Sequence, residues 1–120
     1  MHVKNQFAVE CVALDEYMPD ATVDVIKMDV EGNELKALQG MQGLVARCQN
    51  LTIFAELHPT MLAGRGASVS DYLAMFKTLG FELNIIDEST RSLQPVVMTD
   101  IESHARDDYW HINLYALKSA

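Results

Sequence analysis

Only two cysteines occur in this chain, Cys11 and Cys48, and they lie far apart with no CxxC motif. A chain of this kind offers no disulfide framework. We therefore expect both thiols to be reduced and structural, which is typical of a cytoplasmic protein.

Basic runs and long apolar runs are also absent. The nine Lys and Arg residues are scattered over a chain whose formal net charge is −8. This charge disfavours binding to nucleic acid and to an anionic membrane surface. No stretch approaches the roughly 20 apolar residues that span a bilayer. The amino-terminal "MHVKNQF" has no long apolar core, so it does not read as a signal peptide.

The composition itself is that of an ordinary globular protein. Apolar residues make up 49% of the 120 residues and charged residues 22%. This balance argues against disorder, and the length suits one compact domain with its own core. We therefore predict a single domain over residues 1–120.

Alternating segments of two kinds predict the elements. Strands are predicted at 8–13, 23–29, 51–57, 81–87 and 110–117. Helical segments are predicted at 14–20, 32–38, 41–48 and from a cap at Ser68 or Ser70 to Gly80. Residues 88–109 read as a polar loop.

The order of these segments predicts an α/β fold. The strand at 23–29 is almost continuously apolar, which is typical of a parallel strand covered on both faces. We expect a mostly parallel, Rossmann-like sheet flanked by helices. The last two strands, which have no helix predicted between them, are expected to form an antiparallel hairpin with a long connection.

Charged side chains follow two of the predicted strands. Asp29 and Glu31 end the strand at 23–29, and Glu56 and His58 end the strand at 51–57. In open α/β sheets, ligands bind outside the carboxyl ends of the strands. These residues are therefore the candidate site.

Each of these residues also has a local explanation. Negative charge at Glu31 and Asp29 suits the amino terminus of a helix, and Gly32 permits a tight turn. His58 can act as a general base or lie in a solvated loop. Adjacent carboxylates can hold a metal through oxygen ligands, but the spacing does not demand one, and we predict no metal.

Three segments carry a resemblance to a known family. They are "VALDEYM" at 12–18, "VDVIKMDVEGNELKALQGM" at 23–41 and "LTIFAELHP" at 51–59. This ordered set resembles the FkbM family of S-adenosylmethionine-dependent methyltransferases, and the likeness covers most of residues 9–85. The resemblance implies an O-methyltransferase that acts on a hydroxyl group of a small molecule or sugar.

The resemblance also implies roles for the strand-end residues. Asp29, Glu56 and His58 would be catalytic, and Asp29, Glu31 and Gly32 would contact S-adenosylmethionine. A small-molecule acceptor would be the partner.

One part of the family pattern is not found. In the methyltransferases that this family resembles, a Gly-rich turn in the amino-terminal half of the domain contacts the cofactor. This chain has six glycines and none in a GxGxG arrangement, so it has no counterpart of that turn. The sequence therefore resembles the carboxyl-terminal half of the domain. This leaves two further readings open: a non-catalytic half-domain that forms a homodimer through the strand near 9–13, or a split enzyme with a separate cofactor-binding chain.

Overall fold

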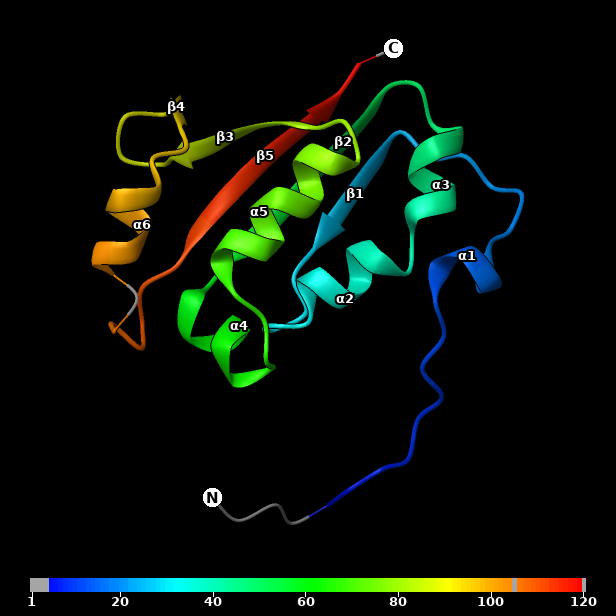
Figure 1. The fold of residues 1–120 in the computed structure, drawn as a ribbon. Coiled ribbons are helices and arrows are strands. Elements are labelled where there is room, and N and C mark those ends of the chain that lie inside the picture. Colours follow the sequence, from blue (N-terminus) through cyan, green and yellow to red (C-terminus); the bar gives the residue numbers. More distant parts are fainter. Residues whose placement is uncertain (1–4, 105, 120) are drawn as a thin grey trace.

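The computed structural model describes residues 5–104 and 106–119. The predicted α/β class is confirmed, with one sheet and a layer of helices (Figure 1). The strands are β1 (Val25–Met28), β2 (Leu51–Leu57), β3 (Glu82–Asp87), β4 (Ser92–Pro95) and β5 (Ile112–Lys118). The helices are α1 (Leu14–Tyr17), α2 (Glu34–Gln39), α3 (Gln42–Arg47), α4 (Pro59–Gly64), α5 (Val69–Thr78) and α6 (Met98–Ser103).

The sheet is mixed and mostly antiparallel, so the prediction of a mostly parallel sheet is wrong. Its strand order is β1-β2-β5-β3-β4, and among the strands of the described residues only β1 and β2 pair in parallel. The reason is the position of β5, which lies between β2 and β3 and runs opposite to both (Figure 1). The expected antiparallel pairing of the last two predicted strands is found between β3 and β5, with Asn84 opposite Tyr115.

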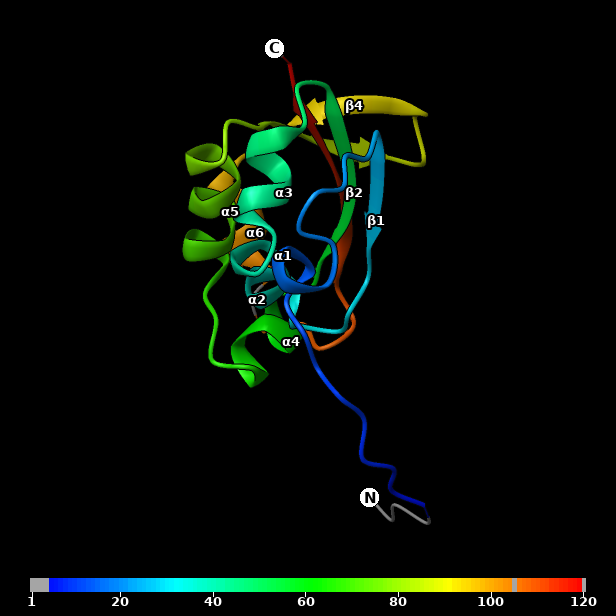
Figure 2. The same cartoon turned by 90° about the vertical axis from the view of Figure 1, so that its right-hand side faces the viewer.

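Several local predictions also fail. Residues 8–13 form no strand. Residues 5–12 are exposed, and the chain extends away from the body towards its amino terminus (Figures 1 and 2), while Ala13 is half-buried. The polar segment 88–109 is not a plain loop, because it contains β4 and α6. Ile101 of α6 is 1% exposed and anchors that helix on the core. Helix α4 was also not predicted. It begins at Pro59 and ends at Gly64, and both residue types are typical of a loop.

All the helices lie on one face of the sheet (Figure 2). Strand β2 shows the consequence, because its residues alternate between buried and half-buried along its whole length. The prediction that the strand at 23–29 is covered on both faces is wrong. It forms the edge strand β1, and Val25 on its uncovered side is 59% exposed.

The core fills the space between the sheet and the helices. The fully buried Tyr72 and Phe76 of α5 are its largest side chains, and their rings lie 5.2 Å apart. The two cysteines are free, with Cys48 buried and Cys11 exposed. Within the described residues, no helix is long and apolar enough to cross a membrane.

Candidate functional site

Strands β1 and β2 run in parallel, so their carboxyl ends lie side by side. Asp29 follows β1 directly, and Glu56 is the second-last residue of β2. Both line a cleft of about 300 Å³ beside the ends of these strands. The cleft is lined by Lys27, Met28, Asp29, Phe54, Ala55, Glu56, Ile86 and Asn113. The predicted meeting of Asp29 and Glu56 at one edge of the sheet is therefore present.

The carboxyl groups of Asp29 and Glu56 lie near each other in the cleft. Burial raises the pKa of Glu56, and the hydrogen bond to Asp29 and its negative charge raise it further. The charge of His111 acts in the opposite direction. A neighbouring carboxylate disfavours the ionised form of Glu56, because like charges repel. When protonated, the Glu56 carboxyl group can donate a hydrogen bond as well as accept one.

Glu34, the first residue of α2, lies near this pair and was not predicted. Its side chain is 1% exposed, and its Oε2 atom has no hydrogen-bond partner. Burial raises its pKa and Asp29 adds to this, while nearby backbone amides lower it. A signal for it was available, because Leu38 is buried one helical turn later on the same face.

Tyr72 of α5 fixes the end of β2 from the helix side. Its hydroxyl group donates a hydrogen bond to the backbone carbonyl oxygen of Glu56 over 3.1 Å. Burial raises the pKa of Tyr72, and the charges of Glu34 and Glu56 add to the effect. Tyr72 therefore stays neutral and acts as a hydrogen-bond donor beneath the site.

Glu31 and Gly32 lie in the turn between β1 and α2, outside the lining of the cleft. Both have a positive φ, 51° at Glu31 and 96° at Gly32. A Cβ atom at Gly32 would lie 2.3 Å from the carbonyl oxygen of Met61. The close approach that Gly32 permits is therefore one between this turn and α4.

His58 joins β2 to α4 and is 8% exposed. Its Nδ1 atom accepts a hydrogen bond of 3.3 Å from the backbone N–H of Met61, which caps α4. His58 therefore serves as a helix cap beside the predicted site. His111, which was not predicted as a site residue, stacks on it with ring centroids 6.1 Å apart. Nothing local in the sequence signals this contact, since it depends on the insertion of β5.

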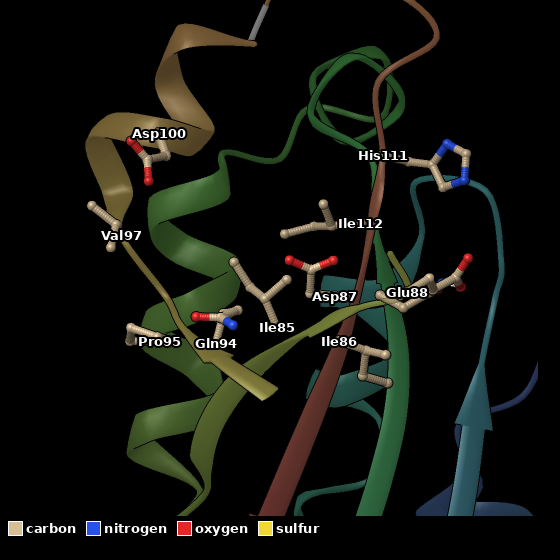
Figure 3. Close-up of a pocket in the computed structure, with 11 residues that line it drawn as sticks. Ile85, Ile86, Asp87, Glu88, Gln94, Pro95, Val97, Asp100, His111 and Ile112 are labelled. Carbon is tan, nitrogen blue, oxygen red and sulfur yellow. Dashed lines mark hydrogen bonds between the residues drawn. The ribbon is translucent and has the colours of Figure 1, made fainter. Parts of the chain in front are cut away.

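A second pocket, of about 560 Å³, adjoins the cleft, since Ile86 and Asn113 line both. It lies between the ends of β3 and β5 and the start of α6 (Figure 3). Its polar side chains include the carboxyl groups of Asp87, Glu88 and Asp100. In Figure 3 the side chains of His111, Glu88 and Ile86 project to one side of β5, away from α6. The two hollows meet at Ile86 and Asn113, and together we call them the groove.

Metal binding finds no ready set of ligands here. Among residues 5–104 and 106–119, no group of three or more His, Cys, Asp and Glu side chains is placed to hold an ion.

Comparison with protein-family models gives one match. The model of the methyltransferase FkbM domain matches residues 2–110. No curated protein and no solved structure matches the chain.

Proposed function

The chain belongs to the family of FkbM methyltransferase domains, and on this premise we propose that it is an S-adenosylmethionine-dependent O-methyltransferase acting on a hydroxyl group of a small molecule or sugar. The family match supports a methyltransferase function and does not favour the alternative of a non-catalytic module. The observation that carries the finer proposal is the Asp29–Glu56 pair in its cleft at the ends of the two parallel strands.

The residues of the cleft suit the charge of this cofactor. S-adenosylmethionine carries a positive sulfonium centre and a positive amine, and carboxylates are the natural partners of both. Asp29 and Glu56 supply them, and Glu34 adds a buried oxygen without a partner. The cleft volume of about 300 Å³ is at the lower end for a ligand pocket. When bound, the cofactor supplies a methyl group on positively charged sulfur.

The other residues of the cleft would position the reactants. Phe54 and Ile86 provide apolar walls that exclude water, and the Asn113 amide can orient an acceptor oxygen. A protonated Glu56 would offer a hydrogen-bond donor to the same oxygen. Positioning of this kind contributes most of the acceleration in a transfer between two bound molecules.

Some predictions stay untested. The catalytic role of His58 and the cofactor contacts of Glu31 and Gly32 remain predictions. The same holds for the cytoplasmic location and for a homodimer or a separate cofactor-binding chain.

The proposal is tested by isothermal titration of the 120-residue chain with S-adenosylmethionine and with S-adenosylhomocysteine. We expect saturable binding that is tighter for S-adenosylmethionine, because only this ligand carries the sulfonium charge. Asp29→Asn should weaken S-adenosylmethionine binding by about tenfold, or ~1.4 kcal/mol. Release of S-adenosylhomocysteine in the presence of a panel of sugars and phenols would then identify the acceptor.

The matched control is Asp24→Asn, which removes an exposed carboxylate just before the other end of β1. It should leave the affinity unchanged. If neither ligand binds the wild-type chain at millimolar concentration, or if both variants behave alike, the proposed function is wrong.

A further inference from the structure

His111 immediately precedes β5, at the point where the chain reaches the groove. Its ring is parallel to that of His58, with 6° between the planes, and the centroids are 6.1 Å apart, so the two rings are offset. His58 is buried and His111 is exposed. The offset stack restricts the orientation of the His111 ring and leaves its edge open to solvent and to a ligand.

The Nδ1 atom accepts a hydrogen bond in His58 and donates one in His111. Nδ1 of His58 accepts a hydrogen bond from a backbone N–H, so its proton must be on Nε2 when the ring is neutral. Nδ1 of His111 lies 3.2 Å from the carbonyl oxygen of Tyr109. A carbonyl oxygen can only accept, so this bond requires the proton on Nδ1 of His111 and leaves a free lone pair on Nε2.

We infer that His111 is the proton acceptor for the hydroxyl group that is methylated. This inference rests on the proposed methyl transfer. A general base needs an unprotonated atom that is held in one direction and is open to the substrate. His111 meets these conditions through its bond to Tyr109 and its stack on His58, whereas the Nδ1 lone pair of His58 is already used by α4.

The transfer forms one bond, breaks one bond and moves one proton. The oxygen of the acceptor hydroxyl forms the new bond to the methyl carbon, and the carbon–sulfur bond breaks with its electron pair left on sulfur. The hydroxyl proton moves to Nε2 of His111. The exposed imidazolium then returns this proton to water.

Titratable groups face His111 from several elements. His58 stacks on it from the start of α4, and Glu56 of β2 interacts with it electrostatically. Glu88, from the β3–β4 turn, projects to the same side of β5 (Figure 3). Asp87 and Asp100 line the same pocket. Carboxyl groups therefore supply most of the charge around this ring.

The first test needs neither cofactor nor acceptor. Long-range proton–nitrogen NMR spectra of the chain with ¹⁵N-labelled histidine, taken where the rings are neutral, report which nitrogen carries the proton. We expect the Nδ1–H form for His111 and the Nε2–H form for His58, which serves as the internal reference. The signals are assigned with His111→Phe and His104→Phe. An Nε2–H form for His111 overturns the inference, whatever the outcome for the proposed function.

The second test measures transfer to an acceptor found in the panel above. His111→Phe keeps an aromatic ring to stack on His58 and removes the lone pair, so kcat should fall about 100-fold with little change in KM. The acid limb of the pH–rate profile should disappear with it. The matched control is His104→Phe, which keeps the stack of that residue on Trp110 and should retain activity. If His111→Phe retains both the rate and the acid limb, His111 is not the base.

Discussion

The hydroxyl group of Tyr72 donates a hydrogen bond to the backbone carbonyl oxygen of Glu56 over 3.1 Å, and so ties α5 to the end of β2. Tyr72 is fully buried, and its bond is made to main chain rather than to a side chain. The contact therefore holds the backbone of the candidate site in place independently of the charge on the Glu56 carboxyl group.

Removing this hydroxyl group should destabilise the fold. In Tyr72→Phe the carbonyl oxygen of Glu56 loses a buried donor, and the free energy of unfolding should fall by about 1 kcal/mol. Urea unfolding followed by circular dichroism measures the change. Tyr109→Phe is the control, since Tyr109 is 90% exposed and should have little effect. Equal stability of the two variants would contradict the role assigned to Tyr72.

Gly32 should tolerate no side chain. Its φ of 96° is strained for any L-residue, and a Cβ atom would meet the Met61 carbonyl oxygen at 2.3 Å. Gly32→Ala should cost more than about 2 kcal/mol or prevent folding. The comparison is Gly64→Ala, at a position where no atom lies within 4 Å of the added Cβ. Gly64 is the last residue of α4, and replacing it with alanine should leave the free energy of unfolding unchanged or raise it. Similar thermal unfolding temperatures for the two variants would disprove this account.

The sequence left Ser68 and Ser70 as alternative caps of α5, and the structure distinguishes between them. The Ser68 hydroxyl accepts a hydrogen bond of 3.0 Å from the backbone N–H of Asp71. Ser68→Ala should therefore lower the free energy of unfolding by about 1 kcal/mol. Ser70→Ala, inside the helix and exposed, should change it by a few tenths at most. If Ser70→Ala lowered the free energy of unfolding more than Ser68→Ala does, Ser68 would not be the cap of α5.

The raised pKa of Glu56 should lower the stability of the fold as the pH rises. Its pKa is raised in the folded chain by burial, by the hydrogen bond to Asp29 and by the charge of Asp29. The folded state therefore binds the proton more tightly than the unfolded state. The contribution to stability is complete below the ordinary carboxyl value of 4.5 and is lost as the pH rises through the raised value.

Glu56→Gln removes this ionisation. Relative to the wild type, the variant should gain stability between pH 4 and pH 8, measured as the difference between urea midpoints at each pH. Glu102→Gln, in the exposed part of α6, is the control and should show no such gain. A gain in stability for Glu56→Gln as the pH falls would have the opposite sign and would contradict a raised pKa of Glu56.

The sequence predicted best the features that short stretches determine. Strand β2 was placed at 51–57 with correct ends, because its apolar residues are bounded by polar ones on both sides. The helix predicted from Ser68 or Ser70 to Gly80 is α5, and its cap is Ser68, one of the two predicted alternatives. The meeting of Asp29 and Glu56 follows from the parallel pairing of two neighbouring strands.

What could not be predicted depends on pairing between distant parts of the chain. No local pattern tells that β5 enters between β2 and β3, and this one insertion makes the sheet mostly antiparallel. The same insertion brings His111 onto His58. Strand β4 and helix α6 were missed because few of their residues are buried, so that tertiary contacts rather than pattern decide their form.

The central place of β5 also affects how the chain can fold during synthesis. Before residues 112–118 leave the ribosome, β1 with β2 and β3 with β4 are two separate strand pairs, and a pair of strands alone is only marginally stable. The inner edges of β2 and β3 stay open over this interval, which favours unwanted pairing with other chains. Completion of the sheet therefore waits for its fifth strand, and with it the groove that holds Glu56 and His111.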